Sequence, residues 1–406
     1  METVPAHIPP HVVFDFDIYG DPRFDEDLHL SFETLHQEAP DVFWTPRNGG
    51  HWVFSRYDDI ATVLRDPDHF SVREQQIPRV ANPPRFIPLS LDPPDNIPYR
   101  QALMPFFAPK TVRAMEPELR KFAADFIEAV KHDGKCDFVN DVSSRFPVSV
   151  FMALMGMPLE RLREFRDTAD LYLKAQSTGN LEIHVAEILR IMTELVQLRQ
   201  AEPKDDLISK MTRFEIQGRP ISLEEVQSIC LILFLGGMDT VTNVASFLFR
   251  YLASDPELQV RLVEQPEKIP DFIEEGLRCF GVVNTPRIVT RDLQQFGVPL
   301  REGDMVLCLL PLGGRDDHKV NDPNRFDIDR AKFDHVTFAT GPHLCLGHNL
   351  ARFEMRILVE EWLKRIPRFQ LKPGTRLKNR LGLVMALEGL PLEWERSAAG
   401  TGESKK

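Results

Sequence analysis

The sequence has little cysteine and no paired cysteine motif. Its 406 residues include five cysteines, spread along the chain without a CxxC pair. A sparse, odd-numbered set of this kind argues against a disulfide framework and against a structural zinc site, which needs several ligands in paired spacing. The cysteine content therefore indicates a reducing compartment, and we expect the protein to be cytoplasmic.

Positive charge and long apolar runs are also scarce. Lysine and arginine total 49 against 61 aspartates and glutamates, a net charge of −12, which argues against nucleic acid as the main partner. The N-terminus has no basic start followed by an apolar run, so no signal peptide is expected. The apolar run ICLILFLGGM falls short of the roughly 18 to 20 residues that span a bilayer. We predict a soluble protein without a membrane segment.

Regular β-α-β alternation is missing as well, and helical periodicity dominates. No linker divides the chain, which predicts one large domain over 1–396, mainly α with small β-sheets, and a disordered tail over 397–406. Helices are expected over 109–132 (divided at Pro117), 146–157, 159–173, 182–199, 222–252, 270–280 and 346–365. Strands are expected over 51–56, 287–300, 304–310 and the segment LVMALEGLPLEW, with a hairpin-like turn at REG between the second and third.

The stretch FATGPHLCLG, residues 338–347, places one cysteine among two glycines, a proline and a histidine. Gly341 and Gly347 relieve steric limits around Cys345, so that backbone N–H groups can point at its sulfur. A helix beginning near Leu346 would favour a negatively charged sulfur at its N-terminus. Two roles remain open for this thiol: a nucleophile with a nearby histidine as base, or a metal ligand. We interpret the other four cysteines as structural.

The pattern F-x-x-G-x-H-x-C-x-G resembles the haem-ligand loop of the cytochrome P450 monooxygenases, and it implies the cytochrome P450 fold. By this resemblance Cys345 is the axial thiolate of haem b iron, where sulfur donates electron density and favours cleavage of the O–O bond. One neighbour departs from the pattern, because Ala339 stands where the family usually has glycine. The five matching positions are Phe338, Gly341, His343, Cys345 and Gly347.

A second match lies about 70 residues earlier in the chain. Glu275 and Arg278 resemble the E-x-x-R pair of the family, and positions i and i+3 share one face of a helix. The segment DPNRFDIDR resembles the family's meander, and it implies Arg325 as the partner of Glu275. We expect these three residues to be structural and to take no part in the chemistry.

Two adjacent glycines interrupt the long predicted helix within GGMDT, residues 236–240. Each costs about 1 kcal/mol relative to alanine inside a helix, so both need a reason. Close packing against another helix is one reading. The resemblance implies instead that the glycines leave room for O₂ and water over the distal haem face. There Thr240 would donate protons, and Asp239 would resupply them by swinging toward solvent.

The resemblance also implies three cations at the haem propionates: Arg100, Arg287 and His343. Arginine suits charge-assisted pairing with a carboxylate at a buried edge. Many relatives carry histidine where this chain has Asn96, which predicts a weaker contact at that point.

End to end, the chain resembles the camphor hydroxylase group of bacterial P450 enzymes. This implies a monomer that receives electrons from a [2Fe-2S] ferredoxin, whose reductase uses NAD(P)H. The ferredoxin would dock around the cysteine loop, near Arg100, Lys332 and Arg352. Pro84 stands where a tyrosine would meet the camphor ketone, so we expect a different terpenoid- or norisoprenoid-like substrate. The expected pocket is almost entirely apolar: Phe86, Leu89, Ile232, Leu235, Gly236, Val283, Leu383 and Val384.

Two other functions stay open. A haem-thiolate binding or sensor protein without turnover would need no proton-delivering pair such as Asp239 and Thr240. A peroxide-dependent hydroxylase would need an acidic or basic group at the distal face in place of the threonine.

Overall fold

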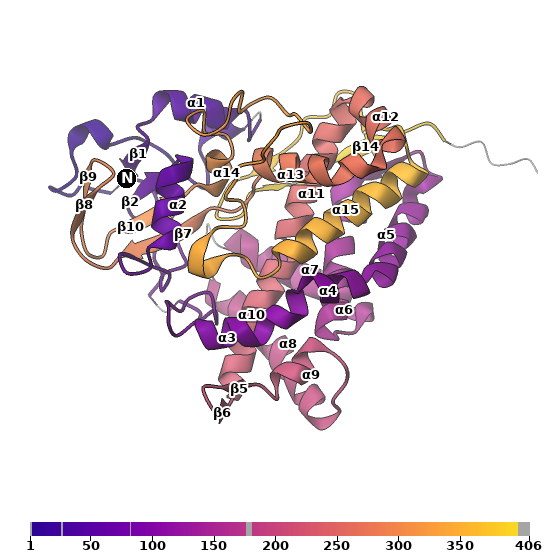
Figure 1. The fold of residues 1–406 in the computed structure, drawn as a ribbon, viewed down its shortest axis with the longest axis horizontal. Coiled ribbons are helices and arrows are strands. Elements are labelled where there is room, and N and C mark those ends of the chain that lie inside the picture. The colour runs from indigo at the N-terminus through magenta and orange to yellow at the C-terminus, as the bar shows by residue number, and fades with distance from the viewer. Residues whose placement is uncertain (1, 26, 82, 176–180, 397–406) are drawn as a thin grey trace, which may run out of the picture.

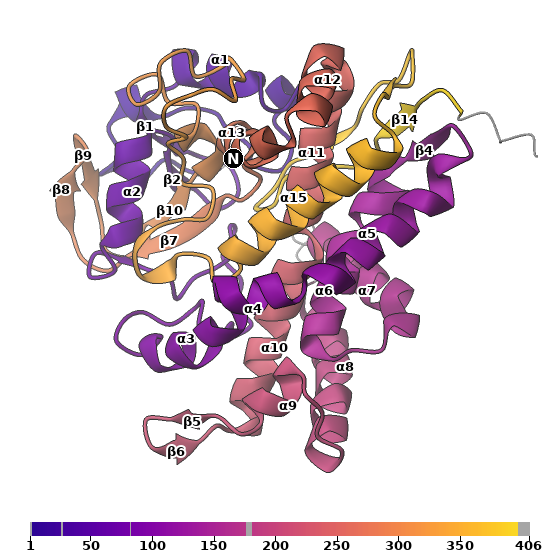
Figure 2. The ribbon, with the colours of Figure 1, turned by 45° about the vertical axis from the view of Figure 1, so that its right-hand side comes forward.

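The structure is a computed structural model that describes residues 2–25, 27–81, 83–175 and 181–396. Helices fill most of it, and a five-stranded sheet lies to one side with the N-terminal segment, as Figures 1 and 2 show. The mainly α prediction with small sheets is confirmed. The tail predicted over 397–406 lies outside the described residues.

The predicted helices are present, with boundaries shifted by a few residues. Pro117 occupies the first turn of α5, as expected for a residue without a backbone N–H. Short helices near the N-terminus and at 207–211, 256–264 and 310–313 add to the predicted set. The helices are α1 Ser31–Glu38, α2 Tyr57–Arg65, α3 Ile97–Leu103, α4 Pro109–Ala114, α5 Glu116–Lys131, α6 Phe146–Met155, α7 Leu162–Ala175, α8 Leu181–Ala201, α9 Leu207–Met211, α10 Leu223–Met238, α11 Thr240–Ser254, α12 Pro256–Glu264, α13 Ile269–Cys279, α14 Leu310–Gly313 and α15 His348–Arg365.

The largest sheet has the strand order β1-β2-β10-β7-β3, with β10 parallel to β2 and antiparallel to β7. The other sheets have the orders β11-β14-β4, β12-β13, β5-β6 and β8-β9. The strands are β1 Val42–Thr45, β2 His51–Phe54, β3 Phe70–Ser71, β4 Lys135–Asp137, β5 Glu215–Ile216, β6 Arg219–Pro220, β7 Thr285–Val289, β8 Leu293–Gln295, β9 Val298–Leu300, β10 Met305–Cys308, β11 Gln370–Leu371, β12 Asn379–Arg380, β13 Ala386–Leu387 and β14 Pro391–Glu393.

The hairpin predicted at REG is wrong. The run expected as one strand over 287–300 divides into β7, β8 and β9, and the tight hairpin joins β8 to β9. Its turn contains Phe296 and Gly297, both with positive φ. The strand β10 skips this hairpin and pairs with β7, so that Arg287 lies opposite Val306 in the middle of the sheet.

The long helix expected over 222–252 is two helices, α10 and α11, separated only by Asp239. Its start is confirmed, because Ser222 and Glu225 form the predicted capping box. Taken together, the stretch Leu223–Ser254 is long and apolar enough to cross a membrane. Its apolar window is 67% buried inside the protein, as the central helices of a folded core are.

The helix α15 follows the cysteine loop and packs along α5, and both figures show the two side by side. Its buried Trp362 lies edge-on to Phe138 and Phe249, with ring centroids 5.1 Å and 5.3 Å away. Burial of large aromatic side chains contributes strongly to the stability of a core. The loop that carries Cys345 therefore leads into one of the most firmly packed helices.

Candidate active site

The cysteine loop is closed by a backbone hydrogen bond. The N–H of Cys345 donates to the carbonyl of Phe338 at 2.9 Å. Cys345 is exposed, whereas Cys230, Cys279 and Cys308 are buried. The sulfur of this loop is thus the one presented to a ligand.

The electrostatic surroundings of Cys345 contain opposing contributions. The flanking protein removes water that would hydrate a thiolate, and this desolvation raises the pKa of the Cys345 thiol. The backbone N–H groups of Gly347 and His348 and the charges of Arg100 and Arg352 oppose the rise. The predicted N–H groups aimed at the sulfur are therefore present, at the start of α15.

The two loop glycines have different roles. Gly341 has φ +71°, and a Cβ there would lie 2.9 Å from the carbonyl oxygen of Leu64, so only glycine fits. Gly347 has φ −81°, which any residue adopts, and a Cβ there would make only an ordinary contact with the sulfur. The steric role predicted for Gly347 is therefore wrong, and its N–H is what matters. Ala339 takes the left-handed φ of 58° that suits the family's usual glycine.

Arg100, Arg287 and His343 are brought together beside the loop. The Nη2 of Arg100 donates to the carbonyl of Leu344 at 2.6 Å. Arg287 is 2% exposed, and it donates hydrogen bonds to the Thr285 hydroxyl at 2.9 Å and to the carbonyl of Pro286 at 2.7 Å. In the described part of the chain, no carboxylate lies within 4.0 Å of this buried cation, although a buried charge normally needs a partner.

His343 is also buried, and its protein surroundings disfavour the positive charge predicted for it. Burial and the charges of Arg287 and Arg100 lower the pKa of His343 to about 3, so the ring is neutral. Its Nε2 lies 3.4 Å from the amide nitrogen of Asn96, and its Nδ1 has no hydrogen-bond partner among the residues that the structure describes. If Asn96 donates to Nε2, the proton is on Nδ1, which leaves a buried donor for an acidic ligand group.

The predicted Glu275–Arg278 pair is a fully buried bidentate ion pair. Both side chains are 0% exposed, and the two N–H···O distances are 2.7 Å. Arg278 also donates to the carbonyls of Gly314 and Pro323 at 2.7 Å. The pair thus ties α13 to the segments after α14, as scaffolding does.

The prediction that Arg325 completes this network is wrong. Arg330 does so instead: its Nε donates to Glu275 at 2.9 Å, and its side chain is 12% exposed. Arg325 is 68% exposed and reaches only Asp327, at 3.6 Å. The backbone explains the difference, because the carbonyl of Arg325 points inward and accepts bonds from Arg278 and Arg330.

The two adjacent glycines of α10 have different surroundings, so close packing explains one of them and open space explains the other. A Cβ on Gly237 would lie 2.3 Å from the ring of Phe151, so this glycine serves close helix packing. A Cβ on Gly236 would meet nothing within 4 Å, and the residue is exposed. Only Gly236 leaves open space of the kind predicted for both.

Asp239 and Thr240 lie at the break between α10 and α11. The Thr240 hydroxyl donates to the carbonyl of Gly236 at 2.9 Å. Asp239 is 7% exposed, and its Oδ2 lies 3.3 Å from the Nη2 of Arg380 on β12. The carboxylate is therefore held by an ion pair, which differs from the free swing toward solvent that we expected.

The predicted pocket residues come from four segments of the chain. The Ile87 N–H donates to the Ser228 hydroxyl at 2.9 Å, which docks the loop of Phe86 and Leu89 onto α10. Ile232 and Gly236 follow Ser228 by four and eight residues, so they lie on the same face of α10, with Leu235 beside them. The third and fourth segments are joined to each other by an isolated β-bridge between Val283 and Val384, beside Leu383.

Sequence reasoning missed two residues, Arg330 and Arg380. Arg330 is the last residue of the DPNRFDIDR segment, which also contains Arg325. The sequence pattern could not tell which of these two arginines pairs with Glu275. Arg380 is 141 positions from its partner Asp239, and no local pattern signals such a pair.

The comparisons with known proteins agree with this geometry. The family model described as Cytochrome P450 matches residues 180–391. The chain is 32% identical over 404 residues to "Probable cytochrome P450 127A1" of Sinorhizobium fredii (strain NBRC 101917 / NGR234), covering 96% of this chain and 97% of that protein. The solved structure of CYP101J2 is similar with a TM-score of 0.89 and 35% identity, and that of CYP101C1 with 0.90 and 30%. Each covers 97% of this chain and 100% of its own.

The chain belongs to the cytochrome P450 family, whose members are monooxygenases that bind haem b. The residues present fit that group. Within the described part of the chain, they offer an exposed thiol flanked by N–H groups, a buried Arg287 without a carboxylate, and a buried His343 nitrogen without a partner. A haem brings an iron that accepts a thiolate and two propionates that accept such donors.

Proposed function

We propose that the protein inserts one oxygen atom from O₂ into a C–H bond of a small hydrophobic substrate, terpenoid- or norisoprenoid-like, within the camphor hydroxylase group. The observation that carries this proposal is the pairing of two sites. One is the thiol loop with its adjacent cations, and the other is the helix break at Asp239 and Thr240 beside an apolar set of side chains.

Four residues of this chain would hold the haem. Cys345 would bind the iron, Arg100 and Arg287 would pair with propionates, and His343 would donate a hydrogen bond to one of them. The bound haem supplies the activation of O₂, which the thiolate ligand promotes. Phe338 and Gly341 set the shape of the loop, and the Gly347 N–H stabilises the sulfur.

Proton delivery is the role we assign to Thr240 and Asp239. The Thr240 hydroxyl can accept a proton while it donates one, and a hydroxyl does so without ionising. Asp239 would resupply that proton, which requires its ion pair with Arg380 to loosen during turnover. The Asp239–Arg380 ion pair would therefore control the rate at which protons reach Thr240.

The substrate would bind mainly through shape and desolvation. Phe86, Leu383 and Val384 are buried or half-buried apolar residues, and each buried CH₂ contributes about 0.8 kcal/mol. Pro84 offers no side-chain donor, which supports substrates other than camphor. A compact ring system such as an ionone-like ketone suits these walls.

Electrons would come from a [2Fe-2S] ferredoxin served by an NAD(P)H-dependent reductase, with the protein acting as a cytoplasmic monomer. Leu344, beside Cys345, is 39% exposed, and the nearby Met104 is 55% exposed. These apolar side chains would join the exposed Lys332 in contacting the ferredoxin. Arg352 contributes less than expected, because Glu274 binds it at 2.5 Å.

A ligand screen tests the substrate class. The haem-loaded protein is titrated with ionones, other cyclic terpenoids, camphor and fatty acids while the Soret band is followed. We expect ionone-like compounds to convert the low-spin band to high spin. A shift produced only by camphor or by fatty acids would refute the class proposed.

Turnover tests the reaction. With a ferredoxin, its reductase and NADH, the best ligand should yield a hydroxylated product that carries one atom from ¹⁸O₂. Binding without any product with several ferredoxins would favour a haem-thiolate sensor. Product formed from hydrogen peroxide alone, at a rate equal to that with ferredoxin, would favour a peroxide-dependent hydroxylase.

A further inference from the structure

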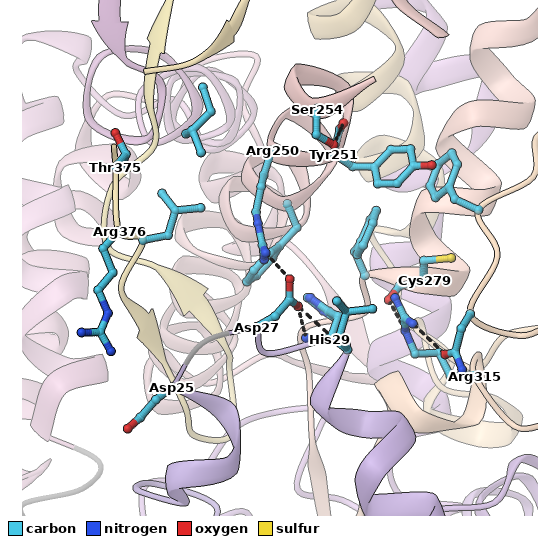
Figure 3. Close-up of a pocket in the computed structure, with 17 residues that line it drawn as sticks. Asp25, Asp27, His29, Arg250, Tyr251, Ser254, Cys279, Arg315, Thr375 and Arg376 are labelled. Carbon is cyan, nitrogen blue, oxygen red and sulfur yellow. Dashed lines mark hydrogen bonds and ion pairs between the residues drawn. The ribbon is translucent and has the colours of Figure 1, made fainter. Parts of the chain in front are cut away.

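A cavity of about 590 Å³ lies apart from the cysteine loop and the predicted pocket. It is shown in Figure 3, and it has a volume typical of small-molecule sites. Its walls come from the segment before α1, the end of α11, the residues after α13, the loop of Phe326, and the segment after β11. Arg250, in its wall, is about 15 Å along α11 from Thr240 at 1.5 Å per residue. None of the residues assigned to the haem or the substrate lines it.

One wall is a stack of aromatic rings. Tyr251 and Phe326 stack with centroids 4.1 Å apart, and Phe280 stacks on Phe326 at 5.8 Å. All three line the cavity. Such a wall favours a ligand that carries a planar ring, because stacked and edge-on ring pairs add about 0.5–1.5 kcal/mol beyond burial.

A buried cation stands at the same wall. Arg315 is 5% exposed; its Nε donates to the carbonyl of Cys279 and its Nη1 to the Asn324 side chain, each at 3.0 Å. Its Nη2 has no acceptor in the part of the chain that the structure describes, and no carboxylate there lies within 4.0 Å of it. A guanidinium stays charged, and its burial without an anion is costly.

The other charged residues that line the cavity do not neutralise the charge of Arg315. Arg250 is occupied by an ion pair with Asp27. Arg376 is exposed and, among the described residues, forms no ion pair, as is also true of Asp25. His29 adds no charge, because burial lowers its pKa well below the usual value and leaves the ring neutral. In the view of Figure 3, Arg376 and Asp25 lie on one side of the cavity and Arg315 on the other.

We propose that this cavity is a second binding site, separate from the haem pocket, for a small carboxylic acid that carries an aromatic ring. The carboxylate would accept a hydrogen bond from Nη2 of Arg315, and the ring would lie against Tyr251, Phe280 and Phe326. Arg376 would attract the anion at the rim. No bond is made or broken in this step.

Isothermal titration calorimetry of the haem-loaded protein with phenylacetate tests the proposal. Saturating imidazole occupies the iron throughout, so that phenylacetate cannot bind by coordinating the iron. We expect one phenylacetate per chain. Acetate lacks the ring and phenylacetamide lacks the charge. Each should bind at least about tenfold more weakly than phenylacetate. No binding of phenylacetate, or equal binding of phenylacetamide, would overturn the proposal.

Variants locate the site. Ser254→Trp places a large ring at an exposed lining position and should abolish binding. Arg376→Glu should weaken it by about fivefold, as expected for an exposed charge. Lys372→Glu makes the same charge change at an exposed residue outside the cavity and should leave the affinity unchanged. Unaltered binding by Ser254→Trp, or equal weakening by Lys372→Glu and Arg376→Glu, would place the ligand elsewhere.

Arg315→Lys keeps the buried charge but loses the planar geometry, and it should weaken phenylacetate by about tenfold. The Soret spectrum and thermal unfolding of the variant show whether it is folded. Should Arg315→Lys fail to fold, the Ser254→Trp and Arg376→Glu measurements still decide the question.

Discussion

The cysteine loop and the helix break at Asp239 carry the two halves of the proposed chemistry, and they are built in different ways. The loop is local: residues 338–348 supply the thiol, the closing backbone bond and the flanking N–H groups. The break is assembled from afar, because Arg380 reaches Asp239 from the C-terminal part of the chain. A local site depends on backbone conformation, whereas an assembled site depends on packing.

The largest effect should come from the local site. Cys345→Ala should abolish the thiolate-type carbon monoxide difference spectrum and all hydroxylation, because no other exposed thiol stands in the loop. The reduced protein with carbon monoxide reports the ligand directly. Cys308→Ala, at a buried strand position, is the control and should keep the spectrum. Normal hydroxylation by Cys345→Ala would end the assignment.

The scaffold behind the loop should show the next largest effect. Arg330→Ala leaves the buried Glu275 short of one partner and should lower the free energy of unfolding by about 3 kcal/mol. Arg325→Ala is the matched control, since that side chain lies in solvent, and should change it by less than about 0.5 kcal/mol. Urea unfolding measures the free energy of unfolding of both variants. A larger loss in Arg325→Ala than in Arg330→Ala would restore Arg325 as the partner of Glu275.

The glycines of α10 separate packing from open space. Gly237→Ala forces a Cβ against the Phe151 ring and should destabilise the protein by about 1–3 kcal/mol. Gly236→Ala meets no neighbour and should leave stability equal or slightly higher, since alanine favours helix. Thermal unfolding measures both changes. Equal destabilisation would mean that Gly236 is packed as tightly as Gly237.

Thr240 and Asp239 at the helix break should affect the coupling of NADH consumption to product formation. Thr240→Ala should keep haem and substrate binding but reduce product per NADH by about tenfold and release hydrogen peroxide instead. Thr240→Ser retains the hydroxyl and should restore most of the coupling. Product and peroxide are quantified together. Unchanged coupling in Thr240→Ala would remove the threonine from proton delivery.

The smallest expected effect returns to the loop. Ala339 holds φ 58°, a conformation that costs a residue with a Cβ about 1 kcal/mol. Ala339→Gly removes that strain but gains freedom in the unfolded chain, so we expect a net stabilisation below about 1 kcal/mol. Differential scanning calorimetry would detect it as a small rise in Tm. A marked fall in Tm would show that the methyl group contributes packing that outweighs the strain.

Much of the proximal half could be predicted from the sequence. The motif around Cys345, the buried Glu275–Arg278 pair and the capping box at Ser222 are encoded by residues within ten positions of one another. Such short-range patterns survive in the folded protein because backbone geometry and helix periodicity enforce them directly.

What the sequence could not decide has a common cause. The choice of Arg330 over Arg325 depends on how a loop turns its carbonyl inward, and the neutral state of His343 depends on burial between two arginines. The pairing of Asp239 with Arg380 joins residues 141 positions apart. The sequence by itself thus determined the thiol loop and most of the long helices, because these follow from local conformation. Only the tertiary structure decided which charges meet, because burial and long-range packing set the distances between them.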